Sequence, residues 1–349
     1  MDLGELRLRD YRPLPRLRVP EHLVPRASVP VIDAHAHLGR WLSGVWAAPD
    51  VGALLGVMDA CNVAAIVNLD GRWGDELEDN LERYDRAHPG RFATCAHLDW
   101  RLLAEPGPTE RLVGSLRQSA AAGARGLKVW KDLGLHVRDE LGDLVMPGDP
   151  RLSDVWDIAG ELGIPVLIHT GDPAAFFDPL DERNERLEEL LEHPDWWFGD
   201  RERSPSFERL LDAFEGLVAA HPRTAFVGVH VAGCAEDLGW VVRMLDAYPN
   251  LSVDIAARIA ELGRQPRAAR ALIERHAGRV LLGTDEVPPT AEAYATHFRF
   301  LETEDEHFPY SCEEVPPQGR WAISGLGLSG EVLEAVCSGN ARRVFPVLA

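Results

Sequence analysis

The chain of 349 residues contains only five cysteines, and none of them stands in a C-x-x-C pair. An odd number of widely scattered cysteines indicates neither a disulfide framework nor a thiolate zinc site. We therefore expect reduced cysteines that pack in the protein core. They are Cys61, Cys95, Cys234, Cys312 and Cys337.

Long apolar segments are also lacking. Residues 1–25 carry repeated charges and prolines instead of the apolar stretch of a signal peptide, and no later segment is both long and uncharged. We expect a cytoplasmic protein that makes no contact with a membrane.

Basic residues are scarce relative to acidic ones, with 36 Lys and Arg against 56 Asp and Glu and a net charge of −20. Nucleic acids and anionic membranes attract basic patches, so this balance argues against both as partners. The 46% of hydrophobic residues is ample for a buried core. We expect a globular protein with a small-molecule substrate, and a homodimer remains open.

Short apolar runs alternate with amphipathic stretches along the chain. This alternation indicates parallel strands joined by crossover helices. The expected strands begin at Val29, Val63, Arg91, Ala124, Ile164, Thr224, Leu251 and Arg279. Segments with helix start and stop signals lie between them at 50–62, 109–123, 152–163, 206–222, 235–249 and 266–278.

Eight such strands predict an α/β fold of the (β/α)₈ TIM-barrel type. An open doubly wound sheet is the alternative, but the glycine-rich phosphate loop that usually follows its first strand is absent. Barrels of this length fold as one unit, so we predict a single domain over 1–349 with an N-terminal extension at 1–28.

Two long segments interrupt the alternation, at 171–206 after the fifth strand and at 286–330 after the eighth. Barrel enzymes build their active sites from loops at these strand ends. We predict that both are active-site insertions acting as lids or in substrate recognition. Residues 184–191 of the first have a helical pattern, and a helix packed on the barrel or on a second subunit is the alternative.

Histidines and one aspartate stand at the ends of the predicted strands. His35 and His37 are two residues apart on the first strand and so share a face. His169, His230 and Asp285 end the fifth, sixth and eighth strands. A single histidine of this kind is often a hydrogen-bonded structural residue, but the carboxyl ends of barrel strands meet at one mouth. Together these residues predict a divalent-metal site.

These motifs resemble the amidohydrolase superfamily, and in particular the amidohydrolase-related (amidohydrolase 2) branch that includes aminocarboxymuconate semialdehyde decarboxylase. The resemblance runs from about residue 31 to 345, through IDAHAHLG, GLKVW, PVLIHTGDP, FVGVHVAG, LLGTDEVP and NARRVF. It implies that His35, His37, His169 and Asp285 bind one divalent metal, usually zinc, with a water in the open position. His230 would be a further ligand or the catalytic histidine beside that water.

The same residues suit a hydrolytic reaction. Zinc with an open position lowers the pKa of its water toward ~7, and manganese, iron or cobalt could occupy the same ligands. Asp285 can accept the proton of the attacking water and return it to the leaving group. His230 can stabilise the developing oxyanion. We expect both to be catalytic residues.

Lys128 ends the fourth strand, where binuclear amidohydrolases place a carbamylated lysine that bridges two metals. The branch that this chain resembles is usually mononuclear. We therefore expect an unmodified Lys128 that orients the substrate or forms an ion pair near the metal. A bridging Lys128, with His230 as a ligand of the second metal, remains the alternative.

Aromatic and arginine side chains follow the first, fourth and seventh strands. Stacking and bidentate hydrogen bonds from such groups would bind a planar or carboxylated compound. The predicted substrate-binding residues are Arg40, Trp41, Trp130 and Arg258. Tryptophan packing in the core is an equal alternative, and Asp254 at the end of the seventh strand could hold one of these groups in place.

Our first hypothesis is a metal-dependent hydrolase that cleaves a C–N or C–O bond of an amide, lactone or cyclic ester. The alternative is a non-oxidative decarboxylase or hydratase of the same branch. Decarboxylases there commonly read H-x-H-x-x-P, whereas Leu38, Gly39 and Arg40 follow His37 here. A catalytically silent binding barrel is the third reading, and the retained ligand-type residues argue against it.

Overall fold

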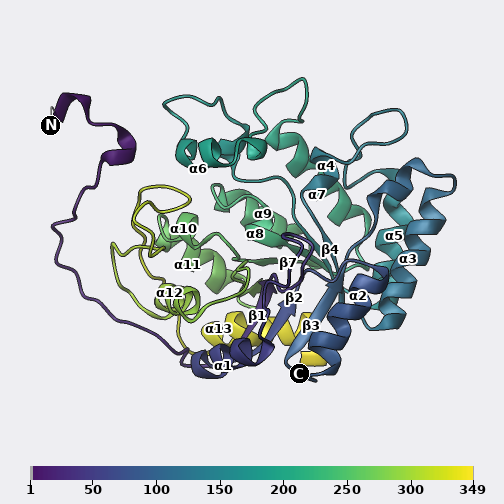
Figure 1. The fold of residues 1–349 in the computed structure, drawn as a ribbon, viewed down its shortest axis with the longest axis horizontal. Coiled ribbons are helices and arrows are strands. Elements are labelled where there is room, and N and C mark those ends of the chain that lie inside the picture. Colours follow the sequence, from purple (N-terminus) through teal and green to yellow (C-terminus); the bar gives the residue numbers. More distant parts are fainter. Residues whose placement is uncertain (1–2, 349) are drawn as a thin grey trace.

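The computed structural model describes residues 3–348, which form an eight-stranded α/β barrel (Figure 1). Each strand pairs in parallel with the next one along the chain. The strands are β1 (Val31–Ala36), β2 (Val63–Asn68), β3 (Phe92–Ala96), β4 (Gly126–Val129), β5 (Val166–Ile168), β6 (Phe226–Gly228), β7 (Leu251–Asp254) and β8 (Val280–Leu281). All eight lie within the runs predicted from the sequence.

Backbone hydrogen bonds join the first strand to the chain at the end of the last one. The N–H of Ala34 donates to the carbonyl of Leu282 at 2.9 Å, and the N–H of Thr284 donates to the carbonyl of His35 at 3.1 Å. The sheet is therefore nearly closed, and the predicted TIM-barrel fold class is confirmed.

Helices alternate with the strands and cover the outside of the barrel (Figure 1). The six helices predicted from the sequence are α1 (Val51–Cys61), α3 (Pro108–Ala122), α5 (Ser153–Leu162), α7 (Phe207–Ala220), α9 (Leu238–Ala247) and α11 (Pro266–Arg275). Side-chain caps begin several of them, as when Asp50 accepts from Ala53 N–H in α1 and Ser206 accepts from Arg209 N–H in α7.

Further helices lie between these or follow the last strand. They are α2 (Gly74–Asn80), α4 (Asp132–Leu135), α6 (Leu187–Glu192), α8 (Val229–Ala232), α10 (Ile259–Leu262), α12 (Ala291–Glu302), α13 (Gly330–Glu334) and α14 (Asn340–Val344). Two π-helical segments, Leu81–Arg86 and Ala335–Gly339, continue α2 and α13.

Apolar side chains fill the barrel interior. Because alternate residues of a strand face the same side, each strand gives its inward positions to this core. Phe345, just after α14, packs with this core and lies against Gly126, the first residue of β4. The amino ends of the strands are thus covered, and the carboxyl ends form the mouth. The inner core comprises Ile32, Ala34, Ala65, Val67, Leu69, Ala93, Cys95, Leu167, Val227, Val229 and Leu281.

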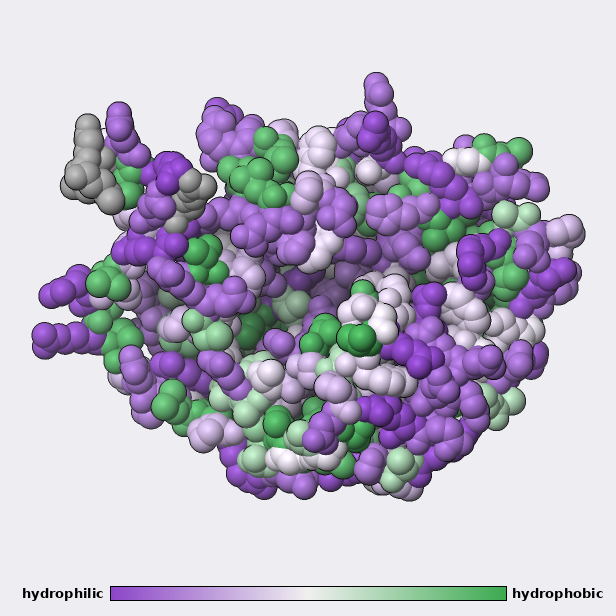
Figure 2. All heavy atoms as spheres, viewed as in Figure 1, coloured by the Kyte–Doolittle hydropathy of each residue, from purple (hydrophilic) through white to green (hydrophobic). Residues whose placement is uncertain are grey.

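One face of the molecule is largely hydrophilic. Hydrophilic residues cover most of the face drawn in Figure 2, and hydrophobic residues form small separate groups. Within residues 3–348, no helix is both long enough and apolar enough to cross a bilayer.

The predicted insertions have partly regular structure. Residues 171–206 contain α6, and Phe176, Phe177 and Phe198 pack there in a small hydrophobic cluster with Leu135 and Leu210. The segment 286–330 contains α12, which packs beside α1, so this part of the predicted insertion is a helix of the outer layer.

The predicted N-terminal extension runs outside the barrel along the segment 286–330 (Figure 1). Arg12 forms an ion pair with Glu314 at 2.6 Å, and the ring of His22 pairs with Asp305 at 2.5 Å. Both contacts join residues nearly a whole chain apart in sequence.

Candidate metal centre and active site

Two histidines and one aspartate meet at the mouth of the barrel. The Nε2 atoms of His35 and His37 lie 2.9 and 3.0 Å from the same oxygen of Asp285, Oδ1. The register of β1 shifts between Asp33 and Ala36, which bends the strand end where both imidazoles stand. The ligand atoms of the three residues lie within 4.8 Å of one another and could hold a metal ion.

Each of these imidazoles is fixed from behind by a buried carboxylate. His35 Nδ1 bonds Asp254 Oδ2 at 2.8 Å, and His37 Nδ1 bonds Asp70 Oδ1 at 2.6 Å. A carboxylate that accepts from the Nδ1–H leaves Nε2, the nitrogen that faces Asp285, as the one available to a metal. Metal-binding histidines are usually oriented by such outer carboxylates. The residues present therefore fit a divalent metal of the kind the sequence predicts.

The centre is rich in negative charge. Burial lowers the pKa of His37, but Asp70 and Asp285 on its two sides more than offset this and raise it to about 9. Burial raises the pKa of Asp285, yet His35 and His230 hold it well below the usual range of a carboxyl. A site with this surplus of carboxylates attracts a cation.

Asp285 is held in an uncommon backbone conformation. Its φ is 68°, in the left-handed region that few residues other than glycine adopt, and its N–H donates to the carbonyl of His35 at 2.8 Å. Asp33 supports this turn, because it accepts from Thr284 Oγ1 at 2.6 Å and from Thr284 N–H at 3.0 Å. Burial raises the pKa of Asp33 to about 6, against the effect of these hydrogen bonds.

His230 stands beside the three central residues, in a run of three left-handed residues at 230–232. Its Nδ1 bonds the carbonyl of Ala256 at 2.8 Å, so Nδ1 carries the hydrogen and Nε2 is an acceptor. Nε2 lies 3.9 Å from Asp285 Oδ2, and burial keeps the pKa well below 6.5. A neutral ring with a bare Nε2 favours a ligand role over the oxyanion role that we considered.

His169 lies next to His230, with 4.4 Å between the ring centroids. It is not part of the compact group formed by the two other histidines and Asp285 among the described residues. Its Nε2 is buried without a hydrogen-bond partner in the described chain, although Asp172 Oδ1 is 3.4 Å away. An unpartnered buried nitrogen on a ring next to the metal-type centre is consistent with the ligand role implied by the sequence.

Lys128 is fully buried at the end of β4. Its Nζ lies 3.5 Å from His35 Nε2 and 5.4 Å from the centroid of the Trp130 ring. Burial lowers the pKa of this lysine, against the opposing effect of Asp285 and Asp254. Lys128 is therefore beside the metal-type centre, as predicted, and its modification stays untested.

The mouth holds a cavity of about 320 Å³, which we call the mouth cavity. Its walls include His37, Lys128, Trp130, Lys131, His169, Asp172, Arg186, Glu189, His230, Arg258 and Asp285. Among the predicted substrate-binding residues, Trp130 and Arg258 therefore line it. Trp130 Nε1 has no hydrogen-bond partner among the described residues, and the guanidinium of Arg258 donates to the carbonyl of Ala257 at 2.9 Å.

The other two predicted substrate-binding residues lie elsewhere. Trp41 packs edge-on against Trp130 at 4.7 Å and donates to Asp70 at 2.8 Å, so it supports the carboxylate behind His37. Arg40 turns to the outer surface, where it pairs with Asp79 at 2.5 Å and lies over the ring of Trp46. The structure does not bring Arg40 to the mouth cavity.

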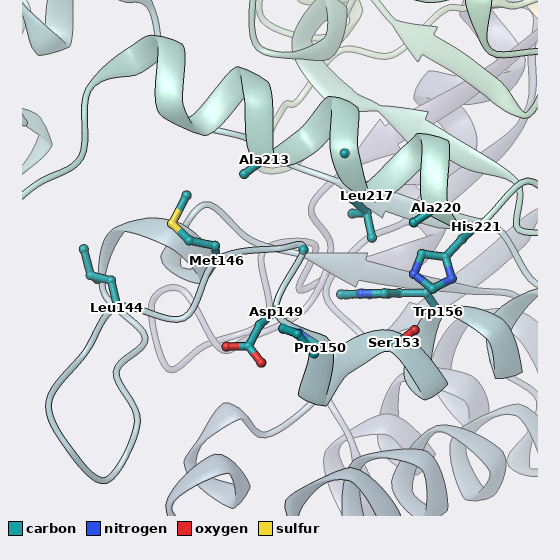
Figure 3. A pocket seen from close by; sticks show the side chains of 12 residues that line it. Leu144, Met146, Asp149, Pro150, Ser153, Trp156, Ala213, Leu217, Ala220 and His221 are labelled. Carbon is teal, nitrogen blue, oxygen red and sulfur yellow. The ribbon is translucent and has the colours of Figure 1, made fainter.

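A larger cavity, of about 670 Å³, lies in the outer layer between α5, α7 and the loop before α5 (Figure 3). It shares no lining residue with the mouth cavity. Leu144, Met146, Trp156 and Leu217 line it, with His221 at one end (Figure 3). Its lining residues include none of the metal-type groups of side chains found among the described residues.

Sequence reasoning missed one essential partner and gave another a different role. Asp70 was not singled out, although it follows β2 by two residues and so stands at a carboxyl strand end like the others. Asp254 was considered as a residue that could hold an aromatic or arginine side chain of the mouth in place, and the structure pairs it with His35. The common signal is an acidic residue at the end of a barrel strand.

An eight-stranded barrel with imidazoles and a carboxylate at its mouth defines the class of barrel enzymes that work with a bound metal. Residues 32–347 match the family described as Amidohydrolase (Amidohydro_2). The chain belongs to this family and is an enzyme of the amidohydrolase superfamily. The resemblance read from the sequence motifs is thereby confirmed. No match was found among curated protein sequences.

Three solved structures of similar fold are distant from this chain in sequence. An uncharacterised TIM-barrel protein from Bordetella bronchiseptica shares 14% identity, with a TM-score of 0.58 over 92% of this chain and 99% of that one. The 2,6-dihydroxybenzoate decarboxylase from Rhizobium shares 15% identity, with a TM-score of 0.54 over 92% and 100%. An amidohydrolase from Burkholderia multivorans with bound zinc shares 15% identity, with a TM-score of 0.51 over 91% and 99%. At these identities the likeness concerns the fold.

Proposed function

We propose that this protein is a mononuclear, metal-dependent hydrolase of small molecules such as amides, lactones or cyclic esters, with zinc as the metal. The observation that carries the proposal is the convergence of His35 and His37 on one oxygen of Asp285, at 2.9 and 3.0 Å. His35, His37 and Asp285 would hold the metal, with His169 and His230 beside them. When bound, zinc supplies a Lewis acid that lowers the pKa of a water to about 7.

Asp285 is the proton carrier in this proposal. Its side chain is about a quarter exposed, whereas His35 is fully buried, so the carboxylate reaches into the mouth cavity. One oxygen, Oδ1, faces the two imidazoles and leaves Oδ2 toward His230. Oδ2 can take a proton from the attacking water and return it to the leaving nitrogen or oxygen.

Arg258 and Trp130 are the groups that would bind the substrate. The guanidinium of Arg258 has no carboxylate within ion-pair distance among the described residues, although the side chain is only 6% exposed. A buried arginine without an anionic partner suits a carboxylate of the substrate. The free N–H of Trp130 adds a second donor beside a ring on which a planar group can stack.

The test of the proposal is Asp285→Asn together with turnover in ¹⁸O-labelled water, on a panel of lactones, amides and aromatic acids. Asn is nearly isosteric and loses the base, so we expect kcat to fall by a factor on the order of 10² to 10⁴ with little change in KM. Metal content is measured in both proteins, so that loss of the metal is not mistaken for loss of the base.

The wild-type enzyme should place one label in the product for each bond cleaved. Release of CO₂ without label in the organic product would instead identify the decarboxylase alternative, which the fold-level likeness to 2,6-dihydroxybenzoate decarboxylase keeps in view. An Asn variant that retains most of its activity would mean that another group in the mouth cavity carries the proton.

A further inference from the structure

A third cavity, of about 430 Å³, adjoins the mouth cavity. Ala257, Asp285, Val287 and Gln318 line both, so the two spaces meet at the carboxylate that we assign as the proton carrier. This third cavity is formed by the turn after β8, by α12 and by residues 310–318. We call it the acidic groove.

The mouth cavity is lined by both basic and acidic side chains, whereas the acidic groove is lined by carboxylates without a lysine or arginine. The mouth cavity contains four basic side chains, of which Lys131 and Arg186 have carboxylate partners while Arg258 has none among the described residues. The acidic groove is lined by Glu286, Glu292 and Glu313 besides Asp285, and its lining includes no lysine or arginine. A molecule that spans both spaces meets a donor-rich end and an acceptor-rich end.

His297 gives an independent reason to expect a cation in the groove. It is 4% exposed, on α12, and its Nδ1 bonds the carbonyl of Ala293 at 2.8 Å. Nδ1 therefore carries the hydrogen, and Nε2 is a bare acceptor that has no partner among the described residues. A buried polar atom without a partner is uncommon and points to a missing donor.

We propose that the acidic groove binds a protonated amino group on the leaving half of the substrate, while the mouth cavity binds the carboxylated half. The proposal rests on the proposed hydrolase function and names its substrate class: acyl compounds, above all amides, whose two halves carry opposite charges. The scissile carbonyl then lies between the two spaces, at Asp285. An ammonium group offers three donors and no acceptor, which matches a groove lined by carboxylates and a bare imidazole nitrogen.

Hydrolysis of such an amide is balanced by groups already described. Water adds its oxygen to the carbonyl carbon, the C–N bond breaks, and the proton taken up by Asp285 passes to the leaving nitrogen. The acid product stays on the side of Arg258, and the amine product is on the side of the groove. Opposite charges would thus draw the two products away from the shared wall in opposite directions.

Two amides of 4-carboxybenzoic acid test the proposal. One carries 1,4-diaminobutane, which ends in an ammonium group, and the other carries pentylamine, which has the same length and ends in a methyl group. We expect the wild-type enzyme to prefer the first in kcat/KM by about tenfold. Glu292→Gln and Glu313→Gln should each reduce that preference by roughly two- to fivefold, the usual effect of one exposed carboxylate on a nearby cation.

Glu331→Gln is the matched control. It removes the same charge from an exposed position on α13, outside both cavities, and should leave the preference unchanged. The control separates a local effect of the groove from the general attraction of cations to a protein with a net charge of −20.

Binding of 1,4-diaminobutane alone, followed by saturation-transfer NMR, separates this proposal from the proposed function. Binding that weakens in Glu292→Gln supports the groove even if neither amide is cleaved, and the hydrolase assignment is then decided separately by the substrate panel in ¹⁸O-labelled water. Cleavage of both amides at equal rates, with no binding of the diamine, would overturn the groove and retain the hydrolase. Displacement of the diamine by Mg²⁺ at equimolar concentration would also overturn it, in favour of a metal cation.

Discussion

Replacement of Asp254 by asparagine should weaken metal binding without changing a proposed metal ligand. Asp254 Oδ1 accepts from the N–H of His230 at 2.7 Å and of Ala256 at 3.2 Å, while Oδ2 faces His35 Nδ1 at 2.8 Å. In the asparagine variant, the amide oxygen still accepts from the backbone N–H groups of His230 and Ala256. Its NH₂ group then faces His35 Nδ1, and two donors cannot share one hydrogen bond.

The ring of His35 can relieve this conflict by changing its tautomer. Nδ1 then accepts from the new amide, and the hydrogen moves to Nε2, the nitrogen that lies 2.9 Å from Asp285 Oδ1. An Nε2–H cannot bind a metal, so metal binding must first reverse the exchange and leave the amide unpaired. Loss of such an outer carboxylate typically lowers metal affinity about 10- to 100-fold, and we expect a value in this range.

The assay is a zinc titration against a chelator of known affinity, with thermal unfolding of the metal-free proteins alongside. Asp33→Asn is the matched control because Asp33 is equally buried and lies on β1 with His35, but bonds no imidazole. Its Oδ2 faces the hydroxyls of Thr284 and Tyr294, which can rotate to accept from an amide. Asp33→Asn should therefore keep its zinc affinity.

Equal zinc affinity in Asp254→Asn and wild type would refute the reasoning, since it would mean that the Nδ1 contact does not set the tautomer of His35. A similar loss in Asp33→Asn would refute it differently, by showing that any change of buried charge near β1 weakens the centre. Asp70→Asn extends the test to His37, because both oxygens of Asp70 accept from N–H donors.

Three further predictions concern the metal, Lys128 and Arg258. The purified protein should carry close to one equivalent of divalent metal by elemental analysis, and full activity in chelator without stoichiometric metal would contradict this. A crystal structure should show an unmodified Lys128, whereas density for a carboxylate on Nζ between two metals would make the site binuclear. Arg258→Ala should raise KM for carboxylated substrates by roughly 10- to 100-fold and leave neutral substrates unaffected, reflecting one charged hydrogen bond; equal effects on both would exclude an ion pair with the substrate.

The parts of the site that could be predicted are those carried by the strands. His35 and His37 were placed together by the two-residue repeat of a strand, and their rings lie 5.5 Å apart. The same repeat continues the inward face of β5 from Leu167 to His169. Strand geometry is local and nearly fixed, so the sequence determines which side chains reach the mouth.

Asp70 does not follow from this two-residue repeat, because Val67 and Leu69 carry the inward face of β2 and Asp70 is out of step with them. It was overlooked because an isolated aspartate after a strand carries no metal-type pattern of its own. Its role depends on where His37 points, and that is set by contact between two strands. The hydrogen bond of 2.6 Å between His37 and Asp70 is a tertiary contact, which neither segment predicts on its own.

His230 and Arg40 show the limit of reasoning from strand ends. Val227 and Val229 belong to the inner core, so a regular continuation of β6 would carry His230 to the other face. Positive φ angles at 230–232 turn the chain instead, and Asp254 accepts from the N–H of His230 at this turn. Arg40 comes only three residues after His37, yet its guanidinium is drawn to Asp79 on α2 and away from the mouth. Distance along the chain does not fix direction once a strand has ended.

The walls that would choose a substrate depend on contacts between distant segments. Arg186 is buried at the mouth because Glu261, 75 residues later, accepts from it, and the acidic groove exists because α12 and residues 310–318 face each other after β8. Neither arrangement follows from a local repeat. Substitutions in these segments should therefore change which substrate is bound while the centre around Asp285 persists, since that centre is built on strands that the inner core holds in place.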